Sequence, residues 1–313
     1  MIFNKDNKGT DELRTITGDY YASNKFDKIS TDIELAAEEL IKITGREVYE
    51  KAEEHYNHPK KEDGLTDKLV SHIRLPVALW ATLQMYRKND VGHNDDGRKI
   101  KIDPEHEKLP WEWQLKRDDE IHLDNYYKAV DRLVAFLDAN SEGIPEWKNS
   151  PQRKTAHSLF LKNAEVFDNY FPIDKSGRLF VILLPFIKNA QRRFIKPALG
   201  EDYNRLLAGT GLSENDSDVL ESACGALALM AFSLAIRRLP LGLIPSGVIR
   251  NYVSQSQTMN ASQPATVSEV RALSEWLTDD AEEMLNEMKE TRNGKIKTDL
   301  FPHNCIKNKY MIV

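Results

Sequence analysis

The sequence predicts a mainly α-helical protein made of two tandem copies of one helical-bundle unit. Three observations support this fold class: apolar residues recur at three-and-four spacing over long segments, capping motifs precede several of these segments, and matching landmarks stand about 150 residues apart. Each copy is also expected to carry a short extended arm or hairpin between its second and third helices. The chain of 313 residues is long enough for two domains of ordinary size.

The first helix of the first copy is predicted from residue 30 to residue 56. Thr31 and Glu34 fit a capping box, in which two side chains bond free backbone N–H groups at the start of a helix. Apolar positions recur at helical spacing along this segment: Ile33, Ala36, Ala37, Leu40, Ile41, Val48 and Ala52. The stretch NHPKKEDGL then interrupts the pattern with Pro, Gly and charge, which predicts a loop.

Two further helices complete the first copy. Thr66 or Asp67 is expected to cap the second helix, which runs through KLVSHIRLPVALWATLQMYRKND, and Pro76 inside it is expected to kink or divide it. The third helix is expected from about Leu115 to Asp138, because apolar residues recur there at helical spacing. Between these two helices, GRKIKID is expected to form an extended piece.

The second half of the chain repeats this order. The segment RLFVILLPFIKNAQRRFIKPALGEDYNRLLAG takes the place of the first helix, GLSENDSDVL the place of the loop and cap, and ESACGALALMAFSLAIRRL the place of the second helix. GVIRNYVSQSQ corresponds to the extended GRKIKID, and the third helix follows a capping box formed by Thr266 and Glu269. The ordered matches indicate a tandem duplication.

The boundary between the copies is expected near NSEGIPEWKNSPQRK, where Gly143 and Pro145 break the helical pattern. We therefore place the first repeat at residues 1–147, the second at residues 148–292 and an extended C-terminal tail at residues 293–313. The tail either docks on a partner, such as a neighbouring subunit, or is a frayed terminus.

Composition excludes several classes of protein. The net charge of −6 and the pI of about 5.8 argue against a protein that coats nucleic acid, because neutralising phosphates requires a surplus of Lys and Arg. Cys224 and Cys305 lie far apart in the sequence, so they predict neither a disulfide framework nor a cysteine zinc site. The longest apolar runs are about half of the ~20 residues that cross a bilayer, and the N-terminus lacks the apolar core of a signal peptide. A protein of the cytoplasm is expected.

The stretch VGHNDDGRKIKIDPEHEKLPWEW has the composition of an active site but not its spacing. His93 and the residues up to Gly97 loosely suggest a calcium loop, yet basic and apolar residues stand where ligands should fall. Pro104 and Pro110 prevent a continuous helix that would align His106 with a second ligand. A metal-dependent hydrolase that uses the 93–112 loop remains an alternative, but we assign no metal, cofactor or catalytic residue.

Other motifs give weaker evidence of function. GTGLS lacks the lysine of a phosphate-binding loop, and the basic segments IRRLP and NAQRRFIKP are interpreted as solvated helix ends. A helical protein-binding module of the cytoplasm is a further alternative.

The extended piece is the candidate site, because it recurs in the second half without its acidic and histidine residues. Both halves retain an extended, strand-like segment, which is suited to pairing with an edge strand of another chain. The tryptophans that follow it are expected to anchor the returning loop to its own core. The predicted assembly arm consists of Arg98, Lys99, Ile100, Lys101, Ile102, Trp111, Trp113, Val248, Ile249 and Tyr252.

The first 90 or so residues resemble the head-tail connector proteins of tailed phages, also called head-completion or adaptor proteins. That family has a helix of the form AAEELI…G, followed by a helix with P-A-L-x-x-L-x-x-Y. The matching residues are Ala36, Ala37, Ile41, Gly45, Pro76, Ala78, Leu79, Leu83 and Tyr86. Over its whole length the chain is similar to an uncharacterised family from prophages of anaerobic gut bacteria.

The resemblance implies a structural protein of the virion, made in the host cytoplasm. Such adaptors assemble as a ring at the neck below the portal, let DNA pass through the channel without binding it specifically, and dock stopper or tail proteins. None of the family's residues is catalytic. Family members are about half as long as this chain, so its two units leave the subunit count of a ring open.

Overall fold

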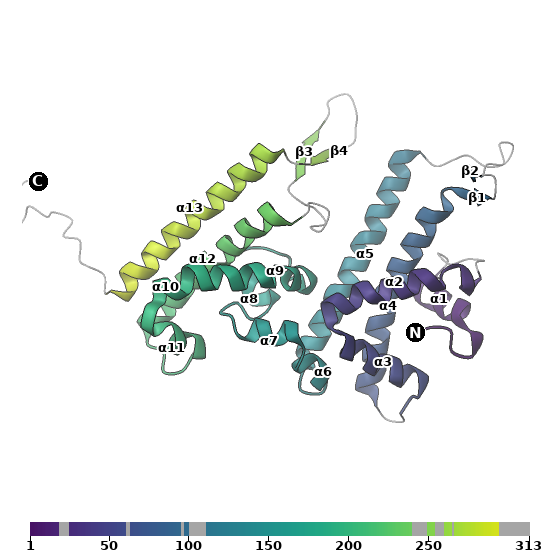
Figure 1. The fold of residues 1–313 in the computed structure, drawn as a ribbon, viewed down its shortest axis with the longest axis horizontal. Helices are drawn as coiled ribbons and strands as arrows, with labels where there is room; N and C mark the ends of the chain where they lie inside the picture. Colours follow the sequence, from purple (N-terminus) through teal and green to yellow (C-terminus); the bar gives the residue numbers. More distant parts are fainter. Residues whose placement is uncertain are drawn as a thin grey trace, which may run out of the picture. The chain divides into compact units, whose positions relative to one another are not determined.

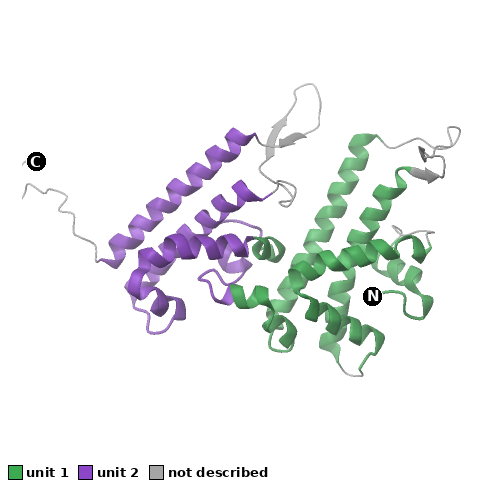
Figure 2. Ribbon diagram, in the orientation of Figure 1, with its two compact units in different colours: residues 1–155, 175–182 green, residues 156–174, 183–313 purple. Residues whose placement is uncertain are grey.

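A computed structural model describes residues 1–18, 25–60, 63–94, 97–99, 111–239, 249–253, 260–264 and 266–293, with the backbone alone for the short strands. The described chain is mainly helical and divides into two compact units (Figure 2). Unit 1 comprises residues 1–155 and 175–182, and unit 2 comprises residues 156–174 and 183–313. The predicted fold class, two tandem helical units with a hairpin between the second and third helices of each, is confirmed.

In unit 1, two long helices pack against each other and shorter helices cover them (Figure 1). The long pair is α4 (Gly64–Asn89) and α5 (Glu112–Ala139). The covering elements are η1 (Lys5–Asn7), α1 (Gly9–Thr17), η3 (Phe26–Lys28), α2 (Ser30–Thr44), α3 (Arg46–Asn57), α6 (Pro145–Lys148) and α7 (Pro151–His157), the last of which ends in unit 2.

The single first helix predicted for residues 30–56 is wrong. Gly45 separates α2 from α3 with φ 89° and ψ 151°, a conformation that a side chain would strain. The predicted capping box at Thr31 is also absent, because α2 begins at Ser30 and Thr31 lies inside its first turn. The cap of α4 is Asp63, whose carboxylate accepts hydrogen bonds from the backbone N–H and hydroxyl of Thr66.

Pro76 does not divide α4, which continues from Gly64 to Asn89. Proline lacks the N–H that would bond the carbonyl of residue 72, so the helix loses one hydrogen bond there. The neighbours Ile73 and Val77 are fully buried. Packing on both sides of the proline therefore holds the helix through the defect.

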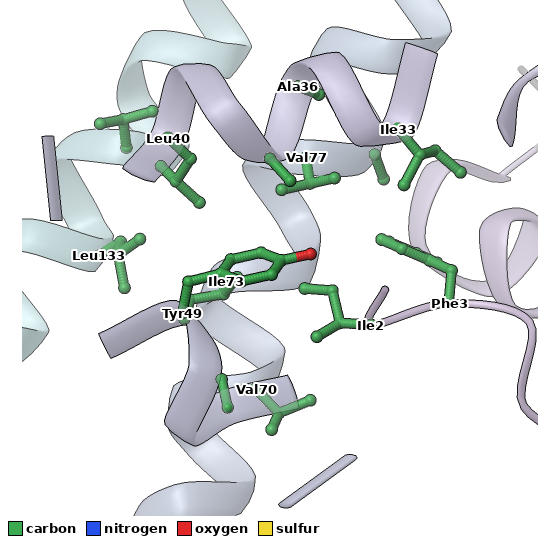
Figure 3. Close-up of a cluster of buried hydrophobic side chains, with 14 of the residues drawn as sticks. Ile2, Phe3, Ile33, Ala36, Leu40, Tyr49, Val70, Ile73, Val77 and Leu133 are labelled. Atoms are coloured by element: carbon green, nitrogen blue, oxygen red, sulfur yellow. The ribbon is translucent and has the colours of Figure 1, made fainter. Parts of the chain in front are cut away.

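The N-terminus of the chain belongs to the core of unit 1. Ile2 and Phe3 are buried among side chains of α2, α3 and α4 (Figure 3). The guanidinium of Arg74 lies 4.8 Å from the centre of the Phe3 ring, and Glu12 accepts hydrogen bonds from the backbone N–H of Asn4 and the hydroxyl of Tyr56. The first three residues therefore act as a core element.

Residues 175–182 join unit 1 through α5. Asp131 accepts hydrogen bonds from the Ser176 hydroxyl and the Arg178 backbone N–H, both at 2.9 Å. The guanidinium of Arg178 lies 3.9 Å from the centre of the Tyr127 ring. These contacts give unit 1 a segment that follows residue 155, whereas the sequence predicted a single boundary after residue 147.

Unit 2 is also built on a pair of long helices, α12 (Glu214–Arg238) and α13 (Val267–Arg292), which pack along each other. The capping box predicted at Thr266 and Glu269 is present at the start of α13. The remaining helices are α8 (Ala164–Asp168), α9 (Gly177–Ala190, whose first residues belong to unit 1), the π-helical turn η4 (Gln191–Ile195), α10 (Lys196–Leu199), η5 (Gly200–Asp202) and α11 (Tyr203–Ala208).

Helix α12 is the central element of unit 2. Among the described helices it alone is long and apolar enough to cross a membrane by length and composition, although its longest unbroken apolar run is shorter than a span, as the sequence indicated. Of its most apolar window, 72% is buried inside the protein, as in many core helices. Ser233, at the contact with α13, bonds the hydroxyls of Ser274 and Thr278 at 2.8 and 3.0 Å.

Candidate assembly surfaces

A two-stranded hairpin connects the long helices of each unit. In unit 1, β1 (Gly92–Asn94) pairs antiparallel with β2 (Gly97–Lys99), and His93 lies opposite Arg98. In unit 2, β3 (Ile249–Val253) pairs antiparallel with β4 (Asn260–Pro264). A two-stranded ribbon leaves backbone groups unpaired along its outer edges, which can pair with another strand.

The predicted assembly arm falls partly within these hairpins. Arg98 and Lys99 lie in β2, and Ile249 and Tyr252 lie in β3. The other predicted strand residues, Ile100, Lys101, Ile102 and Val248, lie outside the described residues. GRKIKID contributes the second strand of its hairpin whereas GVIRNYVSQSQ contributes the first, so the elements that correspond between the units are whole hairpins.

The predicted anchoring of the loop by tryptophans is wrong. Trp111 is 71% exposed and Trp113 is 44% exposed, so neither is inserted into the core of unit 1. The physical reason is that α5 begins earlier than expected, at Glu112. The backbone N–H of Trp111 donates to the Gln114 side chain, which caps the helix and places Trp113 in its first turn.

The core-facing stripe of α5 continues beyond the core of unit 1. Trp111 and Leu115 are one turn apart and align with His122 and Tyr126, which are buried. Leu115 is nevertheless 37% exposed. The described part of unit 1 therefore leaves large apolar side chains exposed at the start of α5.

The third helices of the two units share an exposed apolar position. Helix α5 begins at Glu112 and α13 at Val267, so equivalent residues stand 155 positions apart. In this register the buried His122 matches the buried Leu277. The exposed Ile121 matches the exposed Trp276, so both copies present a large apolar side chain to solvent at the same place.

A polar pocket in unit 1 is the main alternative site. It has a volume of about 350 Å³ between α3 and α4 and is lined largely by charged side chains, including His55 and Asp63. The buried His55 bonds Asp67 at 2.8 Å through Nε2. The Thr66 hydroxyl donates to Asp63, and this bond with that of the Thr66 N–H holds the pKa of the Asp63 carboxyl below its usual range. The Thr66 hydroxyl is therefore already engaged in a hydrogen bond, and the His55–Asp67 pair joins α3 to α4.

The 93–112 loop, the basis of the alternative metal-dependent hydrolase, lies mostly outside the described residues. Side chains are described only for Trp111 and Glu112 in this range. Within the described parts of the chain, no group of three His, Cys, Asp or Glu side chains is placed to hold a metal ion.

Comparison with known protein families matches the chain to a family of unknown function (DUF6712), over residues 40–157 and 189–295. The two matched regions together cover most of the chain. The chain belongs to this family. The two regions begin 149 residues apart, close to the 150 residues that separate the starts of α4 and α12, so the DUF6712 match also supports the tandem repeat. No curated protein and no solved structure matches the chain.

Proposed function

We propose that this protein is a structural component of a phage particle, a head-to-tail connector or adaptor. It assembles as a ring at the neck below the portal protein and docks stopper or tail proteins. DNA passes through the ring without specific binding, and the chain is made in the cytoplasm of the bacterial host. The proposal rests on the resemblance of the first 90 residues to connectors and on surfaces suited to assembly.

One observation supports assembly most directly. In each unit a two-stranded hairpin connects two long helices, and the third helix carries exposed large apolar side chains, among them Ile121 in α5 and Trp276 in α13. Exposed large apolar side chains and the open edges of two-stranded ribbons are both features of surfaces that bind other proteins. Both units have these features, as a subunit that contacts neighbours repeatedly requires.

The test is to remove the arm and measure assembly with the portal protein of the same prophage. Residues 92–110 are replaced by a short Gly-Ser linker, and in a second variant Trp111 and Trp113 are changed to serine. Both proteins are expected to keep the helical content and melting temperature of the wild type but to stop co-purifying with the portal.

A matched control is Leu35→Ser, which removes another exposed apolar side chain, 57% exposed, from α2. It should leave portal binding unchanged. A wild-type protein that never joins the purified portal, at any concentration or salt, would contradict the proposed function. Genes for portal, capsid and tail proteins beside this one would support it.

A further inference from the structure

Two basic segments that are far apart in the sequence meet in unit 2. NAQRRFIKP supplies Arg193 and Phe194 from η4, and IRRLP supplies Arg237 and Arg238 from the last turn of α12. Together they line a pocket with a volume of about 400 Å³. The other lining residues are Met230, Ser233, Leu234 and Thr278. The solvated helix ends predicted from sequence are therefore parts of one basic pocket.

The positive charge of this pocket is not paired within it, although Arg237 also lines a neighbouring pocket that contains Glu275 and Asp279. No Asp or Glu lines it, and none of the three arginines, Arg193, Arg237 and Arg238, pairs with a described carboxylate. The negative end of α12 attracts Arg237 and Arg238, but Arg193 comes from another element. Three guanidinium groups around an apolar floor favour an anionic group from outside, because guanidinium binds carboxylates with paired hydrogen bonds.

The chain itself carries a complementary surface in unit 1. Unit 1 has a net charge of −4 and unit 2 a net charge of −2, counting Lys and Arg against Asp and Glu. On α3, Glu47, Glu50 and Glu54 are exposed on one face, and none forms an ion pair with a described residue. The pocket that they line also contains Lys60 and Lys51, and Lys51 pairs with Glu146. Their seven-residue span places these carboxylates along about 10 Å of helix.

We propose that the arginine pocket of unit 2 binds the acidic face of α3 from unit 1 of a second copy of the chain. The inference rests on the proposed function, since a ring of more than two copies requires two unlike, complementary surfaces on each subunit. Nucleic acid is the less favoured occupant. Three arginines on a chain of net charge −6 do not offset its long-range repulsion of phosphates.

Charge reversal tests this contact. One variant carries Arg237→Glu and Arg238→Glu, and the other carries Glu50→Arg and Glu54→Arg. All four side chains are exposed, so both proteins are expected to fold, which circular dichroism and melting check. Each variant alone should associate more than tenfold more weakly than the wild type in sedimentation velocity at low salt, because like charges then face each other.

An equimolar mixture of the two variants should recover association, since each pocket then meets a surface of opposite charge. Arg192→Glu is the matched control, because Arg192 is exposed in the same turn as Arg193 but does not line the pocket. It should associate like the wild type. Added salt should weaken the wild-type association.

The inference is overturned if the mixture stays monomeric, if Arg192→Glu has the same effect, or if the wild type does not associate at low salt. Loss of binding to a DNA oligonucleotide by the arginine variant, without loss of self-association, would also overturn it. Portal binding separates the two proposals. A chain that binds the portal but does not self-associate through this pocket refutes only the inference, and the opposite result refutes only the proposed function.

Discussion

Asp131 of α5 accepts a hydrogen bond of 2.9 Å from the backbone N–H of Arg178. The same carboxylate oxygen accepts a second bond from the Ser176 hydroxyl. Burial raises the pKa of the Asp131 carboxyl, and the two hydrogen bonds with the charge of Arg178 oppose that shift. One side chain therefore holds the start of α9 against the first unit.

Replacing Asp131 with alanine should destabilise unit 1 by about 1–3 kcal/mol, because it leaves a buried N–H without a partner and removes the negative charge beside the buried Arg178. Ser176→Ala removes one of the two bonds and should cost about 0.5–1.5 kcal/mol. Urea unfolding followed by circular dichroism measures both. Equal effects of the two changes would show that the Arg178 contact is unimportant.

The buried N-terminus predicts a large effect from a residue next to the start of the chain. Phe3→Ala should lower the free energy of unfolding of unit 1 by about 3–5 kcal/mol, the usual cost of removing a core phenylalanine. Thermal unfolding checks this result. Leu35→Ala is the control, because that side chain is mostly exposed and should cost less than about 0.5 kcal/mol.

Two glycines differ in what an added methyl group would meet. At Gly177 a Cβ would lie 2.5 Å from Cγ1 of Val134, whose side chain is short and stiff. Gly177→Ala should therefore destabilise unit 1 by about 1–3 kcal/mol.

At Gly225 the nearest atom is the sulfur of Met284, which can move aside. The gain in helix propensity, about 1 kcal/mol, should then offset the crowding, so Gly225→Ala should be nearly neutral in the same unfolding measurement. A larger loss for Gly225→Ala than for Gly177→Ala would contradict this account.

The capping box of α12 predicts a dependence on pH. Asp216 accepts hydrogen bonds from the backbone N–H and hydroxyl of Ser213, and both terminal nitrogens of Arg205 lie 2.8 Å from it. The Arg205 bonds, followed by those from Ser213, hold the pKa of the Asp216 carboxyl below its usual range. The Asp216 carboxyl therefore has a lower pKa in the folded protein than in the unfolded chain. Its stabilising effect is present at pH values above the unfolded-state pKa and is lost as the pH falls toward the folded-state pKa.

Asp216→Asn should therefore melt below the wild type at pH 7, and the difference should shrink as the pH is lowered below about 4. Ser213→Ala removes the capping hydroxyl and changes no charge, so it should lower the stability by about 1 kcal/mol both at neutral and at acidic pH. Melting curves from pH 7 to pH 2 make the comparison. If the difference in melting temperature between Asp216→Asn and the wild type grew as the pH fell, this account of the pH dependence would be wrong.

The equivalent positions Ile121 and Trp276 predict an effect on assembly without an effect on folding. Because both side chains are exposed, Ile121→Ser and Trp276→Ser should change the melting temperature little. Each should weaken self-association or portal binding if the face is an interface. Sedimentation velocity measures self-association, and co-purification measures portal binding. Unchanged assembly in the double variant would show that the exposed faces carrying Ile121 and Trp276 are not part of an interface.

The predicted elements agree with the structure where the signal is local. The capping box at Thr266 and Glu269 formed as predicted, since its bonds join residues three positions apart. The predicted box at Thr31 failed because α2 starts at Ser30. Whether a motif caps a helix depends on where that helix begins.

The sequence by itself determined which long segments are helical, their two-fold repetition and the presence of an extended element between the second and third helices, because periodicity and chain order carry this information. The tertiary structure decided the rest. It placed Phe3 in the core, left Trp111 exposed and brought Arg193 beside Arg237. These outcomes depend on contacts between residues far apart in the chain, which no local pattern encodes.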